Sequence, residues 1–459
     1  MGRQPTTRLE LSGYRFLVRR MEHALVRGDI RMLDDPLRGQ SLSLIAGVGV
    51  AAIIVAVCAV LAFLRPVGAL DAAPIVMDRD SGALYVRIGD TWHPVSNLAS
   101  ARLIVGSPDV PRAVHAGAIT AAKRGPQVGI AGAPATIGEP LSSDEIGWAI
   151  CDSASTTTLI VGRTNPQNAT QGPDSDGNVL VTNGSTTYLI YDGWRARVDL
   201  RDATVVRVLG LEGVVPRPVS PALLQSVPEA PPIAVPRVAA AGSPGLAGFT
   251  VGTVVRLERA HSTEYYVVLT GAVQRIGEVA ADLIRFTVAQ PAGDIRTVAA
   301  DTIAAAHTAE TLPVGTFPRR TGVVDGRVLC AGWAPHGGSG RTNTSITVGD
   351  SLPVDGSAAV VELVQADGDG PAVDAFAMPP GRSAYVRSTG VTGDGGVGGS
   401  LFVLTDFGVL FGVRDAETAG HLGLSGQPRP APWPILARLP RGPELSKEAA
   451  SVLRDGTPA

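Results

Sequence analysis

Residues 42–64 read LSLIAGVGVAAIIVAVCAVLAFL, an apolar stretch without a single charged side chain. At about 1.5 Å of rise per helical residue it extends roughly 35 Å, enough to cross the ~30 Å hydrocarbon core of a bilayer. The sequence therefore predicts one transmembrane helix at 42–64, a short arm before it (1–41) and a large body after it. A cleaved signal peptide is the alternative, but its apolar region is shorter, about 7–15 residues, and lies closer to the N-terminus.

The arginines predict the orientation of this span. The arm carries eight arginines and five acidic residues, a net charge of +3, whereas the whole chain is at −3 and the rest of it is therefore at −6. Basic residues crowded before a span favour the cytosolic side. We expect a cytosolic arm, a single pass through the membrane and a body on the outer side.

The composition of the body favours strands and turns. The chain has 55 Gly and 35 Pro, only 5% aromatic residues, and lysine only at Lys123 and Lys447. The shortage of basic surface argues against a nucleic-acid partner. Cys151 and Cys330 are the two cysteines of the body, and an exported compartment favours disulfides, so we predict that they pair. Two buried free thiols remain the alternative; a zinc site is disfavoured because neither cysteine has a second Cys or His at ligand spacing.

The arm has the pattern of an amphipathic helix from Ser12 to Arg27, with Ser12 as its N-cap and Gly28 as its stop. A second short helix is expected through residues 30–33, before Pro36. Forty residues cannot bury a core of their own, so the apolar stripe needs a partner, either the anionic inner leaflet or a cytosolic protein domain. The candidate contact residues are Tyr14, Phe16, Arg19, Arg20 and Met21.

The span has small residues at helix-packing spacing. Gly47 and Ala51 are four residues apart, as are Ala52 and Ala56, and this spacing lets another helix approach closely. An ordinary lipid-facing helix has a similar composition, so both interpretations stay open.

Several segments together resemble the EccB family, an inner-membrane component of ESX, or type VII, secretion systems of mycobacteria and relatives. The similarity extends over nearly the whole chain in the family's order. It is carried by PTTRL at 5–9, SGYRFL at 12–17, RRMEHALV at 19–26, DPLR at 35–38, NLASARLI at 97–104, WAICD at 148–152 and LPRGPEL at 439–445.

The body repeats itself. Four segments open with an aromatic or apolar residue, run through a short apolar strand and close on Gly, which is typical of hairpins, and each precedes a stretch that is expected to form a helix. A second echo recurs at 119–128, 224–233 and 436–445, and the third unit lacks it. The hairpin segments are 84–89, 188–193, 266–271 and 402–408, and the helical stretches are 98–104, 203–209, 279–286 and 416–424.

The fold class that we predict is α+β: a helical arm, one transmembrane helix and four α/β repeats around a central, disulfide-stapled β domain. The family resemblance implies the same layout of the body. The expected ranges are 1–41 for the arm, 42–64 for the span, 65–135, 186–235, 250–315 and 399–459 for repeats 1 to 4 (the last with the C-terminal tail), and 136–185 and 320–398 for the two segments of the central domain.

Catalytic motifs are scarce. The sequence has no Walker A motif, no His-Glu-x-x-His and no Gly-x-Ser-x-Gly. Residues 393–398 fit Gly-x-Gly-x-x-Gly, but a predicted strand at 401–404 follows them instead of a helix whose N-terminus could hold a pyrophosphate, so we interpret them as a loop. We expect no cofactor and no metal site.

The function that the resemblance implies is that of a structural subunit of a type VII secretion membrane complex. Implied partners are an EccC-type ATPase, EccD- and EccE-type membrane subunits, a mycosin protease and further copies of this chain. Two alternatives stay open: a periplasmic ATP hydrolase, because family members are often labelled ATPases, and a membrane-anchored module that binds cell-wall polymer. The final repeat departs from the family pattern, with Phe407 and Leu410 where members tend toward Thr and Arg.

Overall fold

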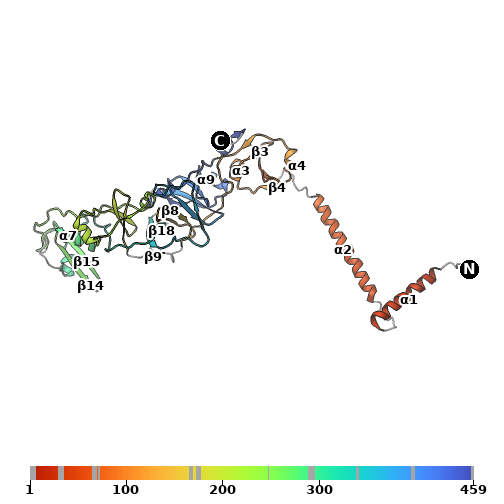
Figure 1. Ribbon diagram of the computed structural model, residues 1–459, viewed down its shortest axis with the longest axis horizontal. Helices are drawn as coiled ribbons and strands as arrows, with labels where there is room; N and C mark the ends of the chain where they lie inside the picture. The colour runs from red at the N-terminus through yellow and green to blue at the C-terminus, as the bar shows by residue number, and fades with distance from the viewer. Residues whose placement is uncertain are drawn as a thin grey trace. The chain divides into compact units, whose positions relative to one another are not determined.

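The computed structural model describes residues 7–28, 36–64, 70, 73–164, 169–171, 177–246, 248–287, 295–336, 341–393 and 398–455. The chain divides into two compact units, Met1–Ala69 and Leu70–Ala459. The ribbon in Figure 1 shows the helices of the first unit in red and orange, and the strand-rich second unit in colours that run from orange through yellow and green to blue. The second unit is called the body below.

The first unit contains two helices, α1 (Arg8–Arg27) and α2 (Pro36–Leu64). Within α2, residues Leu42–Leu61 form the one helix of the described chain that is long and apolar enough to cross a membrane, with a mean hydropathy of 2.9. Pro36 occupies the first helical position, where its missing N–H is not needed and its fixed φ suits a helix. The second helix predicted at 30–33 lies outside the described residues.

Four sheets of the body share one connectivity. Three consecutive strands pair antiparallel, a helix follows, and the next strand returns parallel to the first one. A second helix follows that strand in each case. In chain order the elements are β1 (Ile75–Asp78), β2 (Leu84–Ile88), β3 (Thr91–Val95), α3 (Leu98–Val105), β4 (Arg112–Val114) and α4 (Ala116–Thr120); β10 (Val179–Thr182), β11 (Thr187–Tyr191), β12 (Trp194–Arg197), α5 (Ala203–Leu209), β13 (Arg217–Pro218) and α6 (Pro221–Ser226); β14 (Val254–Arg259), β15 (Ser262–Leu269), β16 (Ala272–Ile276), α7 (Glu278–Thr287), β17 (Arg296–Thr297) and α8 (Ala300–Ala304); β22 (Arg382–Thr389), β23 (Leu401–Thr405), β24 (Leu410–Val413), α9 (Ala416–Leu422), β25 (Arg429–Pro432) and α10 (Trp433–Leu436).

The predicted hairpins and the helices after them are present. Each hairpin turn has a glycine with positive φ, at Gly89 (63°), Gly193 (76°), Gly271 (70°) and Gly408 (77°). Only glycine adopts this backbone region without a steric cost. The helices α3, α5, α7 and α9 occupy the predicted stretches to within one or two residues.

The third sheet has a structural counterpart of the second echo, although its sequence lacks that echo. After α8, Thr308 bridges in parallel to Val273 of β16, as Arg124 bridges to Trp92 and Glu229 to Arg195 in the first two sheets. The sequence of this segment lacks the echo, and the bridge forms without it.

A seven-stranded sheet, called the central sheet below, joins two distant segments of the chain, residues 148–171 and 328–378. Its strand order is β20-β21-β8-β7-β18-β19-β9. The pairs are antiparallel except β21 with β8. The strands are β7 (Trp148–Ser153), β8 (Thr156–Val161), β9 (Ala169–Gln171), β18 (Val328–His336), β19 (Arg341–Gly349), β20 (Ala359–Glu362) and β21 (Ala375–Met378).

Three strands extend the sheets beyond the ranges expected from the sequence. β10 and β22 begin the second and fourth sheets, at positions that were expected in the central domain. Near the C-terminus, β26 (Leu453–Arg454) pairs with β5 (Gln127–Val128) in the first sheet, and α11 (Lys447–Ala450) contacts α3. The chain end therefore returns to the first sheet of the body.

Helix pairs join the sheets through shared apolar cores. α3 contacts α9, and Figure 1 shows the two side by side; α5 contacts α7, and α6 contacts α10. The largest core cluster combines residues of the central, second and fourth sheets, such as Trp148, Ile190 and Leu404. The central sheet is apolar on both faces: Ile150 of β7 packs in the largest cluster, and its neighbour Cys151 packs in a separate cluster on the other face.

Candidate functional site

The arm helix α1 has well-defined ends. Thr7, and not the predicted Ser12, is the N-cap: its hydroxyl accepts from the Glu10 N–H, and the Glu10 carboxylate accepts from the Thr7 N–H. This reciprocal pair is a capping box, and it starts the helix a turn earlier than the apolar pattern suggests. The predicted stop is present, because Gly28 adopts φ 68° and closes the last turn.

The five candidate contact residues of the arm divide between two sides of α1. At about 100° per residue, Tyr14 and Met21 share one side with Leu17, Val18 and Leu25, while Phe16, Arg19 and Arg20 lie on the opposite half of the helix. All five side chains are exposed. The helix therefore offers an apolar stripe and, separately, an arginine-bearing face.

The small residues of the span are accessible in α2. A Cβ added at Gly47 would meet no atom within 4 Å apart from the helix's own backbone. Ala51, Ala52 and Ala56 are likewise exposed. A neighbouring helix would find room at both small-residue pairs.

The predicted disulfide is present at the middle of the central sheet. Cys151 in β7 and Cys330 in β18 are direct cross-strand partners, with Cα atoms 4.0 Å apart, and they form a disulfide across 179 positions of sequence. Both residues are buried. Cys58 in the span is free and exposed, as its position in an apolar helix predicts.

Asp152, next to this disulfide, connects the central sheet to the second sheet. Its carboxylate accepts from the Ser220 N–H (2.7 Å), the Ser220 hydroxyl (2.9 Å) and the Thr157 hydroxyl (2.9 Å). Burial raises the pKa of Asp152, and the bonds from Ser220 and Thr157 oppose that shift. Ser220 is also the N-cap of α6, so one carboxylate positions this helix on β7.

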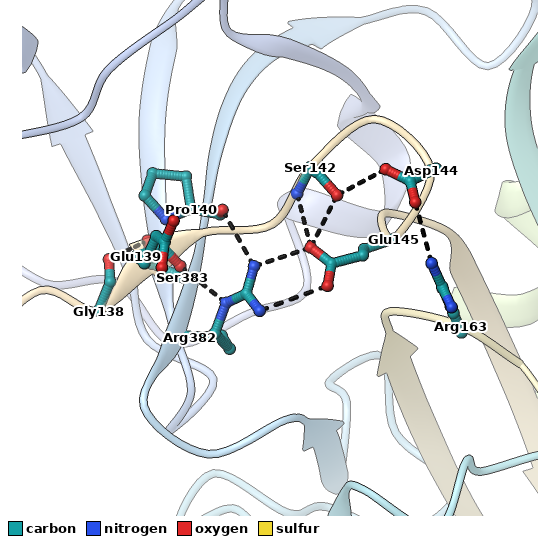
Figure 2. A network of polar contacts seen from close by, with 9 residues as sticks. All are labelled: Gly138, Glu139, Pro140, Ser142, Asp144, Glu145, Arg163, Arg382 and Ser383. Carbon is teal, nitrogen blue, oxygen red and sulfur yellow. Dashed lines mark hydrogen bonds and ion pairs between the residues drawn. The ribbon is translucent and has the colours of Figure 1, made fainter.

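A second polar network, centred on Arg382, connects residues 138–145, which precede the central sheet in the sequence, to the fourth sheet. Figure 2 shows the Arg382 guanidinium between the backbone of β6 (Glu139–Pro140) and the carboxylate of Glu145. It donates to Glu145 at 2.8 Å and to the carbonyl oxygens of Glu139 (3.2 Å) and Pro140 (3.3 Å). The neighbouring Ser383 hydroxyl donates to the Gly138 carbonyl oxygen at 2.7 Å.

The electrostatics of Glu145 follow from these contacts. The Ser142 N–H and hydroxyl donate to the Glu145 carboxylate, and with Arg382 they lower its pKa to about 2. Position 138 admits only glycine, because a Cβ there would clash with the carbonyl oxygen of Gly381. The network holds two segments about 240 positions apart in direct backbone contact, which is a structural role.

The turn between β11 and β12 makes a comparably close approach. Asp192 and Gly193 both have positive φ, 46° and 76°, as a tight two-residue hairpin turn requires. A Cβ at Gly193 would clash with the Thr344 carbonyl oxygen of β19. This glycine brings the second sheet against the central sheet.

A cavity of about 860 Å³ lies beside β12, β15 and β16. Its lining combines the aromatic residues Trp194, Tyr265 and Phe317 with arginines and acidic residues but no lysine. Within the described residues no three His, Cys, Asp or Glu side chains gather as a metal site would require. Of the Gly-x-Gly-x-x-Gly segment, residues 394–397 lie outside the described chain, and the strand predicted after it is present as β23.

Sequence reasoning missed Asp152, Glu145 and Arg382 as organising residues. Arg382 and Glu145 are 237 positions apart, and no motif links two single charges at that distance. The Ser-x-x-Glu spacing of Ser142 and Glu145 was the one local signal, since such pairs often close a turn.

Comparisons with known proteins cover the whole chain. The family model described as "Type VII secretion system ESX-1, transport TM domain B" matches residues 3–459. The chain is 35% identical to the ESX-5 secretion system ATPase EccB5 of Mycobacterium tuberculosis, over 99% of this chain and 94% of that protein. It is 33% identical to the ESX-3 secretion system ATPase EccB3 of Mycolicibacterium smegmatis, over 98% and 91%.

Chains of two solved structures are similar to this chain over nearly all of their own length. A chain of an intact ESX-5 inner membrane complex matches with a TM-score of 0.73 and 33% identity, covering 100% of this chain and 98% of that one. The EccB3 dimer from an ESX-3 core complex matches with a TM-score of 0.71 and 29% identity, covering 83% and 100%.

Proposed function

The chain belongs to the EccB family of type VII secretion components, and we propose that it serves as a structural subunit of an ESX inner-membrane complex. One observation carries this proposal. The whole chain, with arm, span and body, aligns with a chain of an assembled ESX-5 inner membrane complex. The function proposed is to link the cytosolic, membrane and periplasmic parts of the complex and to build its periplasmic section by self-association.

The proposed orientation places α1 in the cytosol and the body in the periplasm. The arginine excess of the arm supports it. The disulfide between Cys151 and Cys330 supports it as well, because disulfides persist in exported compartments.

We further propose that the body consists of four copies of one α/β repeat around the central sheet. The shared strand connectivity and the parallel bridges after α4, α6, α8 and α10 support this reading. On this basis the second repeat begins with β10 and the fourth with β22.

The proposed partners are an EccC-type ATPase and EccD- and EccE-type subunits at the membrane, a mycosin protease at the periplasmic face, and further copies of this chain. A mild-detergent extract of the tagged chain, separated on a native gel and analysed by mass spectrometry, tests this set. We expect a band far larger than the 47.2 kDa chain that contains an FtsK-like ATPase and a many-span membrane protein. A small band with this chain alone would contradict the proposal.

The arm is proposed to dock on cytosolic parts of the complex through Arg19 and Arg20, with Tyr14, Phe16 and Met21 as flanking contacts. Replacing both arginines with Glu is expected to reduce the amount of complex that co-purifies. Replacing both with Lys is the matched control, because it keeps the charge but removes the planar fork that recognises a carboxylate. If the amount of co-purified complex falls with Lys as well as with Glu, the arm docks on protein. If it falls with Glu but is fully retained with Lys, the arginines act by attraction to anionic lipid. Unchanged assembly with Glu would refute an arm contact.

An ATP hydrolase is the second candidate, and the printed names of the relatives, which call them ATPases, favour it. The test is phosphate release from ATP by the purified full chain in detergent. The structural role predicts no turnover beyond that of a mock purification. Turnover that persists through purification and falls when cavity residues such as Arg275 or Arg319 are replaced would establish the hydrolase instead.

A further inference from the structure

The central sheet has one exposed edge. β20 is the last strand on its side of the sheet, and it pairs with β21 through Ala359, Val360, Val361 and Glu362. No strand of the described chain pairs with its outer side. All four residues are exposed, and the strand has neither Lys nor Pro, the residues that usually protect an edge from further pairing.

Large apolar side chains gather at this edge. Val360 and Val361 are 46% and 44% exposed, on opposite faces of the strand, and Val364 just beyond it is fully exposed. Phe407, 70% exposed, belongs to the β23–β24 turn. That turn lies against the end of β20, because a Cβ at Gly408 would touch the side chains of Leu363 and Phe376.

We propose that the β20 edge is a surface on which two copies of this chain associate, β20 pairing antiparallel with β20 of the second copy. The proposal rests on the self-association proposed above and names the surface that supplies it. Under a two-fold axis each copy presents the same patch to the other, so a strand edge that is its own complement satisfies the symmetry.

The sequence of β20 fits pairing with itself. A two-fold axis perpendicular to the sheet keeps each residue on its own face, so it must pass through a pair of identical residues. In an antiparallel pair centred on Val360, each Val360 faces Val360 of the other copy, Val361 faces Ala359, and Glu362 faces Ala358. Apolar β-branched pairs stabilise such a contact, whereas like charges placed opposite each other destabilise it, and here the two glutamates do not meet. The backbone groups of the open edge gain hydrogen-bond partners, and the exposed side chains of Val364 and Phe407 extend the apolar contact at the ends.

Cysteine crosslinking of the full-length chain tests this surface. The variant V360C is made in a C58S background, which removes the free cysteine of the span, and is co-expressed in membranes with two different tags. After mild oxidation, we expect disulfide-linked dimers that carry both tags. V215C in the same background is the matched control, because Val215 is also a strongly exposed valine (84%) but lies away from this edge.

A charge variant completes the design. V360K/V361K places lysines on the edge and is expected to reduce self-association several-fold, while an intact Cys151–Cys330 disulfide and unchanged thermal unfolding show that the body still folds. Crosslinking no greater than that of V215C, or crosslinking of the edge to a different protein, would overturn the proposal. If the chain without edge crosslinks still co-purifies with the membrane complex, the surface is wrong and the scaffold function stands.

Discussion

Removing the disulfide tests how the central sheet holds together two distant segments of the chain. The variant is C151A/C330A, in which alanine avoids burying a new hydroxyl group. The bond closes a loop with a sequence separation of 179, and on the chain-entropy model this restrains the unfolded chain by about 5 kcal/mol at 25 °C. Engineered disulfides often deliver less, so this value is the upper end of the loss expected from this restraint.

The fold itself is expected to survive the substitution. β7 and β18 remain paired from Trp148 opposite Trp333 to Ser153 opposite Val328, and both cysteines lie within that ladder. Because the disulfide acts on the unfolded chain, the loss is in stability and not in native structure. Both cysteines are buried in an apolar cluster, so removing the two sulfur atoms also leaves a small cavity, whose cost adds to that of the lost restraint.

Urea unfolding of the full chain in detergent, followed by tryptophan fluorescence, measures the loss. Trp148 and Trp333 are direct cross-strand partners near the disulfide and report on the central sheet. We expect a lower urea midpoint for C151A/C330A, a lowered midpoint for the wild type with reductant as well, and no effect of reductant on the variant. C58A is the control and should leave the midpoint unchanged, because Cys58 forms no disulfide. A variant as stable as the oxidised wild type would refute the reasoning.

Three further predictions concern single contacts of the body. R382Q removes the guanidinium that joins β6 and Glu145 to β22, so we expect faster proteolysis within 138–145; R163Q, which breaks only an exposed ion pair with Asp144, is the control and should match the wild type. The pKa of Glu145 in the folded chain is lowered to about 2, so its contribution to stability is present above about pH 4.5 and is lost as the pH falls toward 2. E145Q should remove this part of the fall of the melting temperature at acid pH. The same fall in E145Q and the wild type would contradict this prediction. G193A should lower the melting temperature of the body more than G184A does. Both glycines have positive φ, which costs an alanine about 1–2 kcal/mol, but only at Gly193 would a Cβ also clash with the Thr344 carbonyl oxygen. Equal melting temperatures of the two variants would show that this close approach is unimportant.

Local patterns predicted the local elements of this chain. The apolar run at 42–64 predicted a span, because a bilayer imposes a length and excludes charge, and the structure has a helix of that kind at Leu42–Leu61. The glycines that close the four hairpin segments predicted tight turns, because positive φ is a property of a single residue. The Ala- or Leu-rich stretches after them predicted α3, α5, α7 and α9.

Local patterns were less reliable where the signal was weak or indirect. The start of α1 was misplaced because its capping box lies outside the apolar stripe on which the expectation relied. The backbone bridge after α8 has no signal in the sequence, because a bridge needs no particular residue type.

Contacts between distant residues were decided by the tertiary structure alone. A parallel strand such as β13 or β25 needs only two to four residues of extended chain, too few for a sequence signal, and its position is fixed by the strand beside it. The ion pair of Arg382 with Glu145 and the bonds of Asp152 to Ser220 join charges and hydroxyl groups that are unremarkable in the sequence. The sequence by itself determined the span, the hairpins and the two cysteines, because each depends on neighbouring residues or on composition. Which edges, carboxylates and glycines meet depends on how the sheets pack, and that is a property of the folded chain as a whole.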